Sequence, residues 1–356
     1  MSAGIGTEYG SPMVSDGGVR RPGPASMREV AELAGVAMSS VSRVLSDHPD
    51  VSPPMRARVL AAVDQLGYKP DLLAQSLRRR ETRSVGFVVS DVSNQLFAEI
   101  VKGAETALRE AGYSMLLTNS ENDPELDAEH VRLFERRRAD GLILSLAQER
   151  HPPTIEQLER LDIPFVLIDR DVPPTIAASR VLSDHRRGMT AAVDHLLGLG
   201  HRRIALITGQ STRPGRERRL AFEDAFAARG LPPTHAVREG TFSLETGARF
   251  TEELLELPHP PTALIAGGNQ LMLGALRVIS DRGLELGRDL SFVGCDDIAV
   301  TSLYRPPIAV VRRDNVALGR TAAELLLARI RDGAEPSEVV LPTEFVARSS
   351  CGPRRS

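Results

Sequence analysis

The 356-residue sequence contains two cysteines, Cys295 and Cys351, and no long apolar run. Two cysteines are too few for a disulfide framework or a cysteine-ligated metal site, so they favour a reducing compartment. The first 25 residues are rich in Gly, Ser and Pro and contain no apolar segment of the signal-peptide type. No later run reaches the length that a membrane-spanning helix needs. We therefore expect a cytoplasmic protein with no membrane partner.

Local signatures of common enzyme classes are also missing. The sequence contains no G-x-x-x-x-G-K-[ST] phosphate loop, no G-x-G-x-x-G dinucleotide motif and no G-x-S-x-G nucleophile motif. Its eight histidines are scattered, and the nearest to a pattern, His195 and His201, have no carboxylate or cysteine at metal-ligand spacing. These histidines are better explained as surface residues or as caps of helix ends. We therefore expect no catalytic residues, no metal and no cofactor.

The length of the chain indicates several domains, and its charge is distributed unevenly between them. A chain of this length exceeds what one hydrophobic core usually serves, so two or three domains are expected. The formal net charge is −3, which argues against a uniformly basic coat for nucleic acid. Residues 26–83 nevertheless hold nine Lys/Arg against seven Asp/Glu, whereas residues 84–356 hold thirty-three against thirty-eight. Residues 1–25 have too little apolar surface to fold and are expected to form a disordered leader.

Start and stop signals predict three helices after the leader. Ser26 and Glu29 form a capping-box pattern that begins the first helix, and Gly35 ends it. A second helix is expected over 38–45, and a third from Pro53, after the cap Ser52, to Gly67. Two short helices joined by a glycine turn and backed by a third form a helix-turn-helix arrangement. The second helix is then the one that enters the major groove of DNA.

The second helix has a polar face that its own packing does not explain. Val41, Val44 and Leu45 are expected to face the other two helices. Met38, Ser39 and Arg43 are left to meet base edges, and Ser40 and Ser42 to donate to phosphates. A solvated face of a small helical bundle would explain a lone serine cluster. The capping box, glycine turn and third helix together favour DNA binding.

The stretch "YKPDLLAQSLRRRETRS" follows the third helix. Asp71 is placed to cap a helix of about two turns in which Leu73, Ala74 and Leu77 form a narrow apolar stripe, with three arginines after it. Two interpretations stay open. The segment is either a basic linker or a hinge helix that orders on DNA, pairs with its twin and inserts a leucine into the minor groove.

Beyond this segment the pattern changes to alternating short apolar runs and amphipathic stretches. The runs are VGFVVS, SMLLTN, GLILSL, PFVLID, RIALITG, TALIAGG and SFVGC. Such runs with helices between them predict buried parallel strands of a doubly wound α/β body. We expect a first lobe from about Arg83 and a second from about Arg180, with a ligand cleft at the carboxyl ends of the strands.

Several ordered segments resemble those of the LacI/GalR family of bacterial transcriptional repressors. They are VAELAGVAMSSVSRVL, VSPPMRARVLAAVDQLGYKPDLLAQSL, GHRRIALITG, LGALRVISDRGLELGRDLSFVGCDD and RPPIAVVRRD. The match as a whole runs from Ser26 to about Arg348. The resemblance implies an all-α helix-turn-helix head and hinge helix, then a two-lobed α/β core with parallel sheets like periplasmic sugar-binding proteins. It also implies a homodimer whose affinity for DNA responds to a small molecule.

The resemblance assigns roles to individual residues. For DNA, it implies base readers at Met38, Ser39 and Arg43, backbone contacts at Ser40, Ser42 and Tyr68, and an intercalating leucine at Leu77. For the effector, it implies Phe97, Asp169, Arg218, Phe222 and Asp296. Carboxylates accept paired hydroxyls, arginine donates in a fork, and an aromatic face covers a sugar ring. Taken singly, each aspartate also suits a turn cap and each phenylalanine a plain core position.

Four positions depart from the family pattern. Gly268-Asn269 stands where an Asn-Asp pair is usual, which removes a carboxylate from the cleft. Ala37 replaces a usual serine at the start of the second helix, and Asp71 replaces an asparagine. These changes bear on the class of effector more than on DNA binding. A sugar or sugar derivative is the family default.

The sequence therefore predicts a ligand-responsive, sequence-specific DNA-binding transcriptional regulator, a repressor by resemblance. Expected domains are a leader over 1–25, a helix-turn-helix domain over 26–70, a hinge helix over 71–82 and a two-lobed core over 83–356. A dimer is expected because two heads must meet two half-sites of a palindromic operator. No leucine heptad tail follows the core, so nothing suggests a tetramer. A sugar-binding protein without a regulatory DNA role is the alternative.

Overall fold

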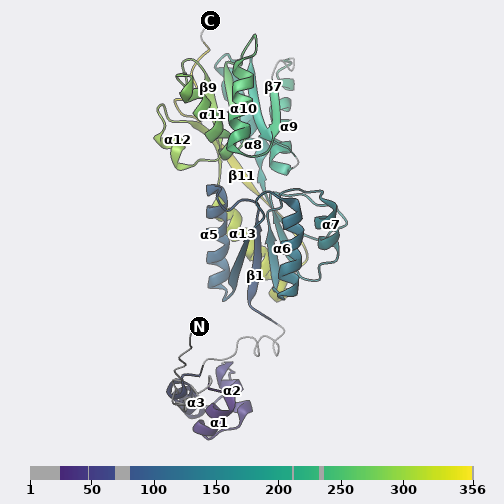
Figure 1. The fold of residues 1–356 in the computed structure, drawn as a ribbon, viewed down its shortest axis with the longest axis vertical. Coiled ribbons are helices and arrows are strands. Elements are labelled where there is room, and N and C mark those ends of the chain that lie inside the picture. Colours follow the sequence, from purple (N-terminus) through teal and green to yellow (C-terminus); the bar gives the residue numbers. More distant parts are fainter. Residues whose placement is uncertain (1–24, 47, 69–80, 211, 232–235, 355–356) are drawn as a thin grey trace, which may run out of the picture. The chain divides into compact units, whose positions relative to one another are not determined.

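The computed structural model describes residues 25–46, 48–68, 81–210, 212–231 and 236–354 (Figure 1). The leader expected over 1–25 lies outside them except for Ala25. The hinge helix expected over 71–82, including Leu77, lies outside them except for Glu81 and Thr82. The chain divides into two units, Met1–Arg80 and Glu81–Ser356, and each is taken by itself.

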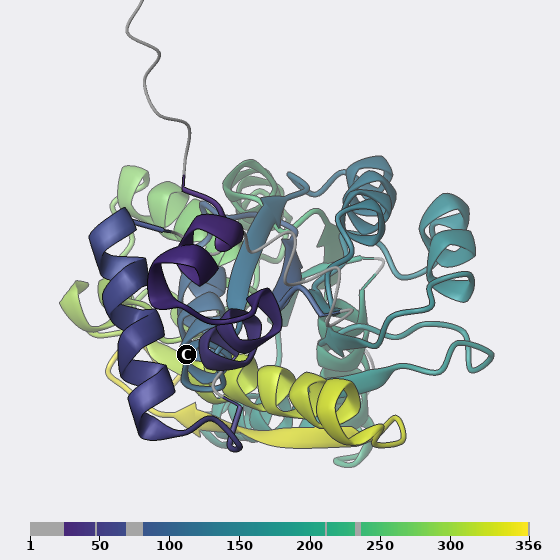
Figure 2. The ribbon, with the colours of Figure 1, turned by 90° about the horizontal axis from the view of Figure 1, so that it is seen from below.

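The first unit contains the three predicted helices, which pack against one another (Figure 2). They are α1 (Met27–Ala34), α2 (Met38–Leu45) and α3 (Pro53–Leu66). The capping box is confirmed, since the backbone N–H of Ser26 donates to Glu29 Oε2 at 2.6 Å and that of Glu29 donates to Ser26 Oγ at 3.3 Å. Gly35 and Gly67 end α1 and α3 at φ 63° and 58°, where glycine avoids the steric cost of a Cβ.

Local packing explains why this small unit holds together. Val30, Val41 and Val59 contribute one residue from each helix and are fully buried in a shared apolar cluster. Ala37 precedes α2 and cannot cap it, because alanine has no hydrogen-bonding side chain. Ser52 takes the cap position of α3, also without a side-chain hydrogen bond. Burial of the valine face, and not capping, therefore positions α2.

The second unit is built on eleven described strands in the order β2-β1-β3-β4-β5-β11-β10-β9-β8-β6-β7. The first-lobe strands are β1 (Ser84–Val89), β2 (Ser114–Asn119), β3 (Gly141–Leu144), β4 (Phe165–Ile168) and β5 (Ser179–Asp184). The second-lobe strands are β6 (Ile204–Gly209), β7 (Ala236–Gly240), β8 (Ala263–Ala266), β9 (Ser291–Cys295) and β10 (Ala309–Arg313). The last strand, β11 (Glu338–Val346), pairs in parallel with β5 and antiparallel with β10, so it joins the two lobes.

Helices cover both faces of each lobe (Figure 1). The first lobe carries α5 (Gln95–Glu110), α6 (Pro124–Arg136), α7 (Pro152–Glu159) and α13 (Asn315–Asp332). The second carries α8 (His185–Gly198), α9 (Arg213–Ala227), α10 (Leu244–Leu255), α11 (Asn269–Asp281) and α12 (Ala299–Leu303). Among the described residues, no helix is both long and apolar enough to span a bilayer.

All seven apolar runs identified in the sequence are strands, so the predicted doubly wound architecture is confirmed. The expected lobe boundary near Arg180 is wrong, because β5 still pairs with β4 in the first-lobe sheet and the chain enters the second lobe with α8. The late helix α13 returns to pack on α5. Each lobe is therefore completed by chain that is distant in sequence.

The crossing of α5 and α13 depends on two glycines. A Cβ on Gly103 would lie 2.1 Å from the carbonyl oxygen of Val316, and a Cβ on Gly319 would lie 1.9 Å from that of Ile100. We expect Gly103→Ala to destabilise the core by about 1–3 kcal/mol through overpacking, measured by urea unfolding. Gly198→Ala is the control, because nothing lies within 4 Å of its added Cβ. Equal stability of both variants would contradict the close crossing.

Candidate functional site

The outer face of α2 carries most of the predicted DNA-binding residues. Met38 is 50% exposed, Ser39 and Arg43 are exposed, and Ser40 and Ser42 are half-buried. Val41 and Val44, on the opposite face, are buried against the other helices. The 3.6-residue period thus separates a buried apolar stripe from an accessible polar face.

Tyr68 is placed differently from the α2 residues. It is 9% exposed and packs in the apolar cluster of the first unit. Its backbone N–H donates to the carbonyl oxygen of Val63 as α3 ends. A contact between Tyr68 and the DNA backbone therefore stays a prediction, as does the intercalation by Leu77.

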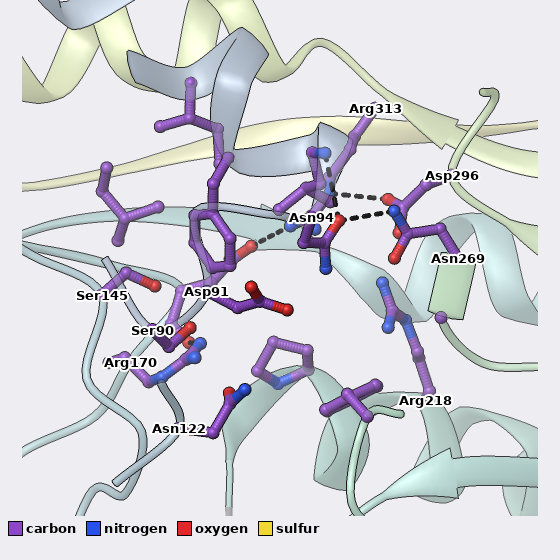
Figure 3. Close-up of a pocket in the computed structure, with 18 residues that line it drawn as sticks. Ser90, Asp91, Asn94, Asn122, Ser145, Arg170, Arg218, Asn269, Asp296 and Arg313 are labelled. Atoms are coloured by element: carbon purple, nitrogen blue, oxygen red, sulfur yellow. Dashed lines mark hydrogen bonds and ion pairs between the residues drawn. The ribbon is translucent and has the colours of Figure 1, made fainter. Parts of the chain in front are cut away.

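A cavity of about 80 Å³ lies between the two lobes of the second unit (Figure 3). The side chains around it come from the carboxyl ends of strands and the first turns of helices. Polar and charged residues that line it are Ser90, Asp91, Asn94, Asn122, Ser145, Asp169, Arg170, Arg218, Asn269, Asp296 and Arg313. The predicted position of the cleft, beyond the strand ends, is thereby confirmed.

Four of the five predicted effector residues line this cavity: Phe97 from α5, Asp169 after β4, Arg218 from α9 and Asp296 after β9. The placement of Phe222 in the cleft is wrong. It is fully buried in the second-lobe core, with its ring centroid 5.2 Å from that of Phe226. Phe222 lies one turn, about 5.4 Å, further along α9 than Arg218, and this carries it past the cavity wall.

The two predicted aspartates share one cation that the sequence analysis missed. Arg313, at the end of β10, contacts Asp169 through Nη1 and donates from Nε to Asp296 Oδ1 at 3.0 Å (Figure 3). All three side chains are at least nine-tenths buried. Asp169 also accepts from the backbone N–H and Oγ of Ser183 at 2.6 and 2.9 Å. The segment RPPIAVVRRD contains this arginine, but nothing local marks it as a partner of either aspartate.

Charge and hydrogen bonds fix the protonation states of this group. Burial alone raises the pKa of Asp169, but His185, Arg313 and the Ser183 N–H together bring it well below its usual range. Burial lowers the pKa of His185 to about 4, so this imidazole is neutral near pH 7. Near pH 7 the positive charge beside Asp169 is therefore that of the Arg313 guanidinium, because His185 is neutral.

Direct hydrogen bonds join the two lobes. Asn269 Nδ2, at the start of α11, donates at 2.6 Å to Oδ1 of Asn94, the residue that caps α5 (Figure 3). In a second contact between the lobes, the buried Glu149 accepts from the backbone N–H of Arg213 at 2.5 Å and from Arg216 Nη1 at 3.0 Å. These contacts connect the first lobe directly to the second.

A buried carboxyl near the cavity gives a pH-dependent prediction. Asp127 accepts from the backbone N–H of Ala147 at 2.7 Å, and burial raises its pKa to about 6 despite that bond and one from Ser120. A raised folded pKa means that stability falls as pH rises from about 4 to 6. Asp127→Asn should therefore stabilise the protein by about 1–3 kcal/mol at pH 8 and change little at pH 4, measured by urea unfolding. If Asp127→Asn changed the stability equally at pH 4 and pH 8, the raised pKa of Asp127 would be contradicted.

The described residues offer no metal centre, since no group of three or more His, Cys, Asp or Glu side chains among them is arranged to hold an ion. Cys295 is fully buried, and burial raises the pKa of its thiol to about 11, so it is no nucleophile near pH 7. The polar and charged side chains that line the cavity can form hydrogen bonds and ion pairs with a polar molecule.

Comparisons with known proteins match both units. A family model described as "Bacterial regulatory proteins, lacI family" matches residues 26–71, and one for a periplasmic binding protein-like domain matches residues 193–351. The transcriptional repressor PurR of Haemophilus influenzae (strain PittEE) is 32% identical over 334 residues, covering 92% of this chain and 98% of PurR. The ribose operon repressor of Escherichia coli (strain K12) is 32% identical over 311 residues, covering 86% and 93%.

Solved structures agree with the sequence comparisons. A crystal structure of the lac repressor dimer, bound to operator and the anti-inducer ONPF, superimposes with a TM-score of 0.82. It is 29% identical in sequence, and the alignment covers 92% of this chain and 99% of the repressor chain. The likeness therefore extends over both units and not over the core alone.

Proposed function

The chain belongs to the lacI family of bacterial regulatory proteins, and from this premise we propose that it is a dimeric repressor of transcription that binds a palindromic operator. A small effector, in the family default a sugar or sugar derivative, occupies the cavity between the lobes and changes the affinity for DNA. The observation that carries the proposal is the combination, in one chain, of an exposed polar face on α2 with a cavity at the strand ends.

The α2 face supports direct reading of bases. Arg43 is exposed on the helix that a helix-turn-helix places in the major groove, where its fork suits the O6 and N7 acceptors of guanine. Met38 and Ser39 flank it on the same exposed face, and Ser40 and Ser42 are placed to meet phosphates. The dimer is supported by the lac repressor neighbour, whose dimer is bound to operator.

The contacts across the cavity support a mechanism of control. An effector that adds contacts to both lobes favours the closed arrangement held by Asn94–Asn269 and Glu149–Arg216. In a dimer, closure changes the spacing of the segments that connect each core to its head. The two binding events are then coupled, and the coupling free energy is the same in both directions.

The proposal places the protein in the cytoplasm, where operator DNA lies, and assigns it no enzymatic activity. The named relatives are transcriptional repressors, which supports both statements. The cavity residues described above have structural or binding roles that need no reaction.

Selection of binding sites from random duplex DNA, with and without a panel of sugars and sugar acids, tests the proposed function. We expect a recurring palindrome with half-sites about one helical turn apart, whose enrichment changes with one ligand. If no sequence were enriched under any condition, the proposal would fail in favour of a sugar-binding protein without a regulatory DNA role.

A further inference from the structure

The helix α9 begins without a cap from its own neighbours. Thr212 takes the N-cap position, but its side chain makes no cap hydrogen bond, and its Oγ1 has no partner among the described residues. The first turn contains no acidic residue and carries two arginines, Arg213 and Arg216, at the end of the helix where the peptide dipoles are positive. By contrast, the side chain of the preceding residue caps each of α5, α6, α8, α10 and α13. The first turn of α9 is therefore unfavourable by itself.

A carboxylate from the other lobe takes the place of the missing cap. Glu149 follows β3 in the first lobe, and its Oε1 accepts from the backbone N–H of Arg213, 64 residues later, at 2.5 Å. The same oxygen accepts from the backbone N–H of Asp171 at 3.3 Å, within the first lobe. The Glu149 side chain is 4% exposed, so it depends on protein donors in place of water. The start of α9 is thus capped across the boundary between the lobes.

The two arginines of the first turn meet carboxylates of the same lobe. Arg216 donates from Nη1 to Glu149 at 3.0 Å and from Nη2 to Asp171 at 2.5 Å, so one guanidinium joins two carboxylates of the first lobe. Arg213 Nη1 lies 3.5 Å from Asp171. Within the second lobe, Arg216 contacts Glu217 at 4.0 Å. Separation of the lobes would therefore remove the shorter contacts and leave two positive charges at the positive end of α9.

The helix start that contacts Glu149 also forms part of the cavity wall. Pro214 and Arg218, from the first and second turns of α9, line the cavity. Of the described residues, Glu149 is not one that lines it. A helix end that loses its cap is less stable and opens more often. The order of this part of the wall therefore depends on a contact that lies outside the cavity.

We propose that Glu149 is an interlobe cap: approach of the two lobes completes the N-terminus of α9, and their separation leaves it uncapped. The arrangement of the lobes is thereby coupled to the order of the cavity wall. Glu149 is a positioning residue, which acts through α9 without contacting the effector. The part that this coupling plays in controlling DNA binding rests on the proposed function, whereas the cap itself does not.

Hydrogen exchange at the Arg213 amide, measured by NMR on the full-length protein without added ligand, tests the cap. The Leu206 amide, in the second-lobe core strand β6, reports general stability, so the measured quantity is the ratio of Arg213 exchange to Leu206 exchange. Glu149→Ala should raise this ratio by about fivefold or more, because the Arg213 amide loses its acceptor. An unchanged ratio would overturn the cap.

Glu223→Ala is the matched control for the exchange measurement. Glu223 is also a glutamate at α9, but it pairs with Arg219 of the same helix at 2.9 Å. Its removal takes away a carboxylate without changing the acceptor of the Arg213 amide. We expect the wild-type ratio in this variant. A rise equal to that of Glu149→Ala would show a general effect of charge on α9 and would also overturn the cap.

A third variant tests whether the cap depends on the approach of the lobes. Asn269→Ala removes the hydrogen bond from Asn269 to Asn94 and leaves Glu149 and Arg213 in place. If separation of the lobes uncaps α9, this variant should also raise the exchange ratio, by less than Glu149→Ala does. A purely local contact would leave the ratio at its wild-type value, and that result would overturn the coupling.

Failure of this inference and failure of the proposed function give different results, because the exchange measurements involve no DNA. A protein that enriches a palindrome but keeps the wild-type ratio in Glu149→Ala and Asn269→Ala would be a regulator without an interlobe cap. A raised ratio in both variants of a protein that enriches no DNA sequence would keep the cap and overturn the regulatory function.

Discussion

Replacing Arg43 by alanine is expected to weaken binding to the selected palindrome by about 2–6 kcal/mol. One bidentate arginine–guanine pair contributes about 1–3 kcal/mol of discrimination, and a dimer loses one at each half-site. Arg43 is exposed on α2, while the valines behind it keep the helix in place, so the fold should not change. Fluorescence anisotropy at fixed salt, with the selected duplex and a scrambled duplex, gives the specificity ratio.

The specificity ratio separates base reading from general attraction to phosphates. Arg28→Ala is the control, because Arg28 lies on α1, where its exposed side chain is 3.8 Å from Glu32. Removing a positive charge at that position should weaken binding to both duplexes alike and leave the ratio unchanged, because attraction to phosphates carries no sequence information. If Arg43→Ala kept the wild-type ratio, the α2 face would not be the base-reading surface.

Replacing Arg313 by alanine should destabilise the core by about 3–5 kcal/mol. The substitution leaves Asp169 and Asp296 buried without their shared cation, and removing one partner of a buried ion pair has an effect of this size. Arg312→Ala is the neighbouring control: its half-exposed side chain pairs with Glu344 at 2.8 Å, and such surface pairs contribute less than about 1 kcal/mol. Urea unfolding near pH 7 measures both differences.

The pH dependence of the Arg313→Ala effect has a definite sign. The folded pKa of Asp169 is lowered, so the stability gained from its ionisation is present above its unfolded pKa of about 3.9 and is lost as pH falls. The difference between wild type and Arg313→Ala should therefore shrink below about pH 4. Equal stability of Arg313→Ala and Arg312→Ala at neutral pH would contradict the assigned ion pairs.

The head was predictable because its signals are local. The capping pair Ser26 and Glu29 is three residues apart, and Gly35 and Gly67 each stand where a helix must end in a left-handed turn. The apolar positions of α2 follow from helical periodicity alone. Such features depend on neighbours within one or two turns, which a single sequence displays directly.

The cavity was only partly predictable, because its polar contacts join distant parts of the chain. Arg313 is 144 residues from Asp169, and Asn269 is 175 residues from Asn94. No spacing rule pairs such residues. The family resemblance assigned five residues to the cleft. Phe97, Asp169, Arg218 and Asp296 do line the cavity, whereas the packing of α9 directs Phe222 into the core.

Four strands lacked the apolar runs by which the others were identified. β5, β7, β10 and β11 have sequences SRVLSD, AVREG, AVVRR and EVVLPTEFV, in which the apolar stretches are short and have charged residues within them or directly beside them. β7 lies at an edge of the sheet order, and the others lie where the lobes join. Strands at such places are less enclosed by helices, so charged residues are tolerated.

The central claim is that an effector bound in the cavity changes the affinity for operator DNA, and that operator bound by the helix-turn-helix units changes the affinity for the effector. The most direct test measures the affinity of the full-length protein for the selected operator with and without saturating effector, and for the effector with and without saturating operator. The account predicts that both affinities change in the same direction and by the same factor. Two unchanged affinities would contradict it, because the cavity would then have no part in regulation.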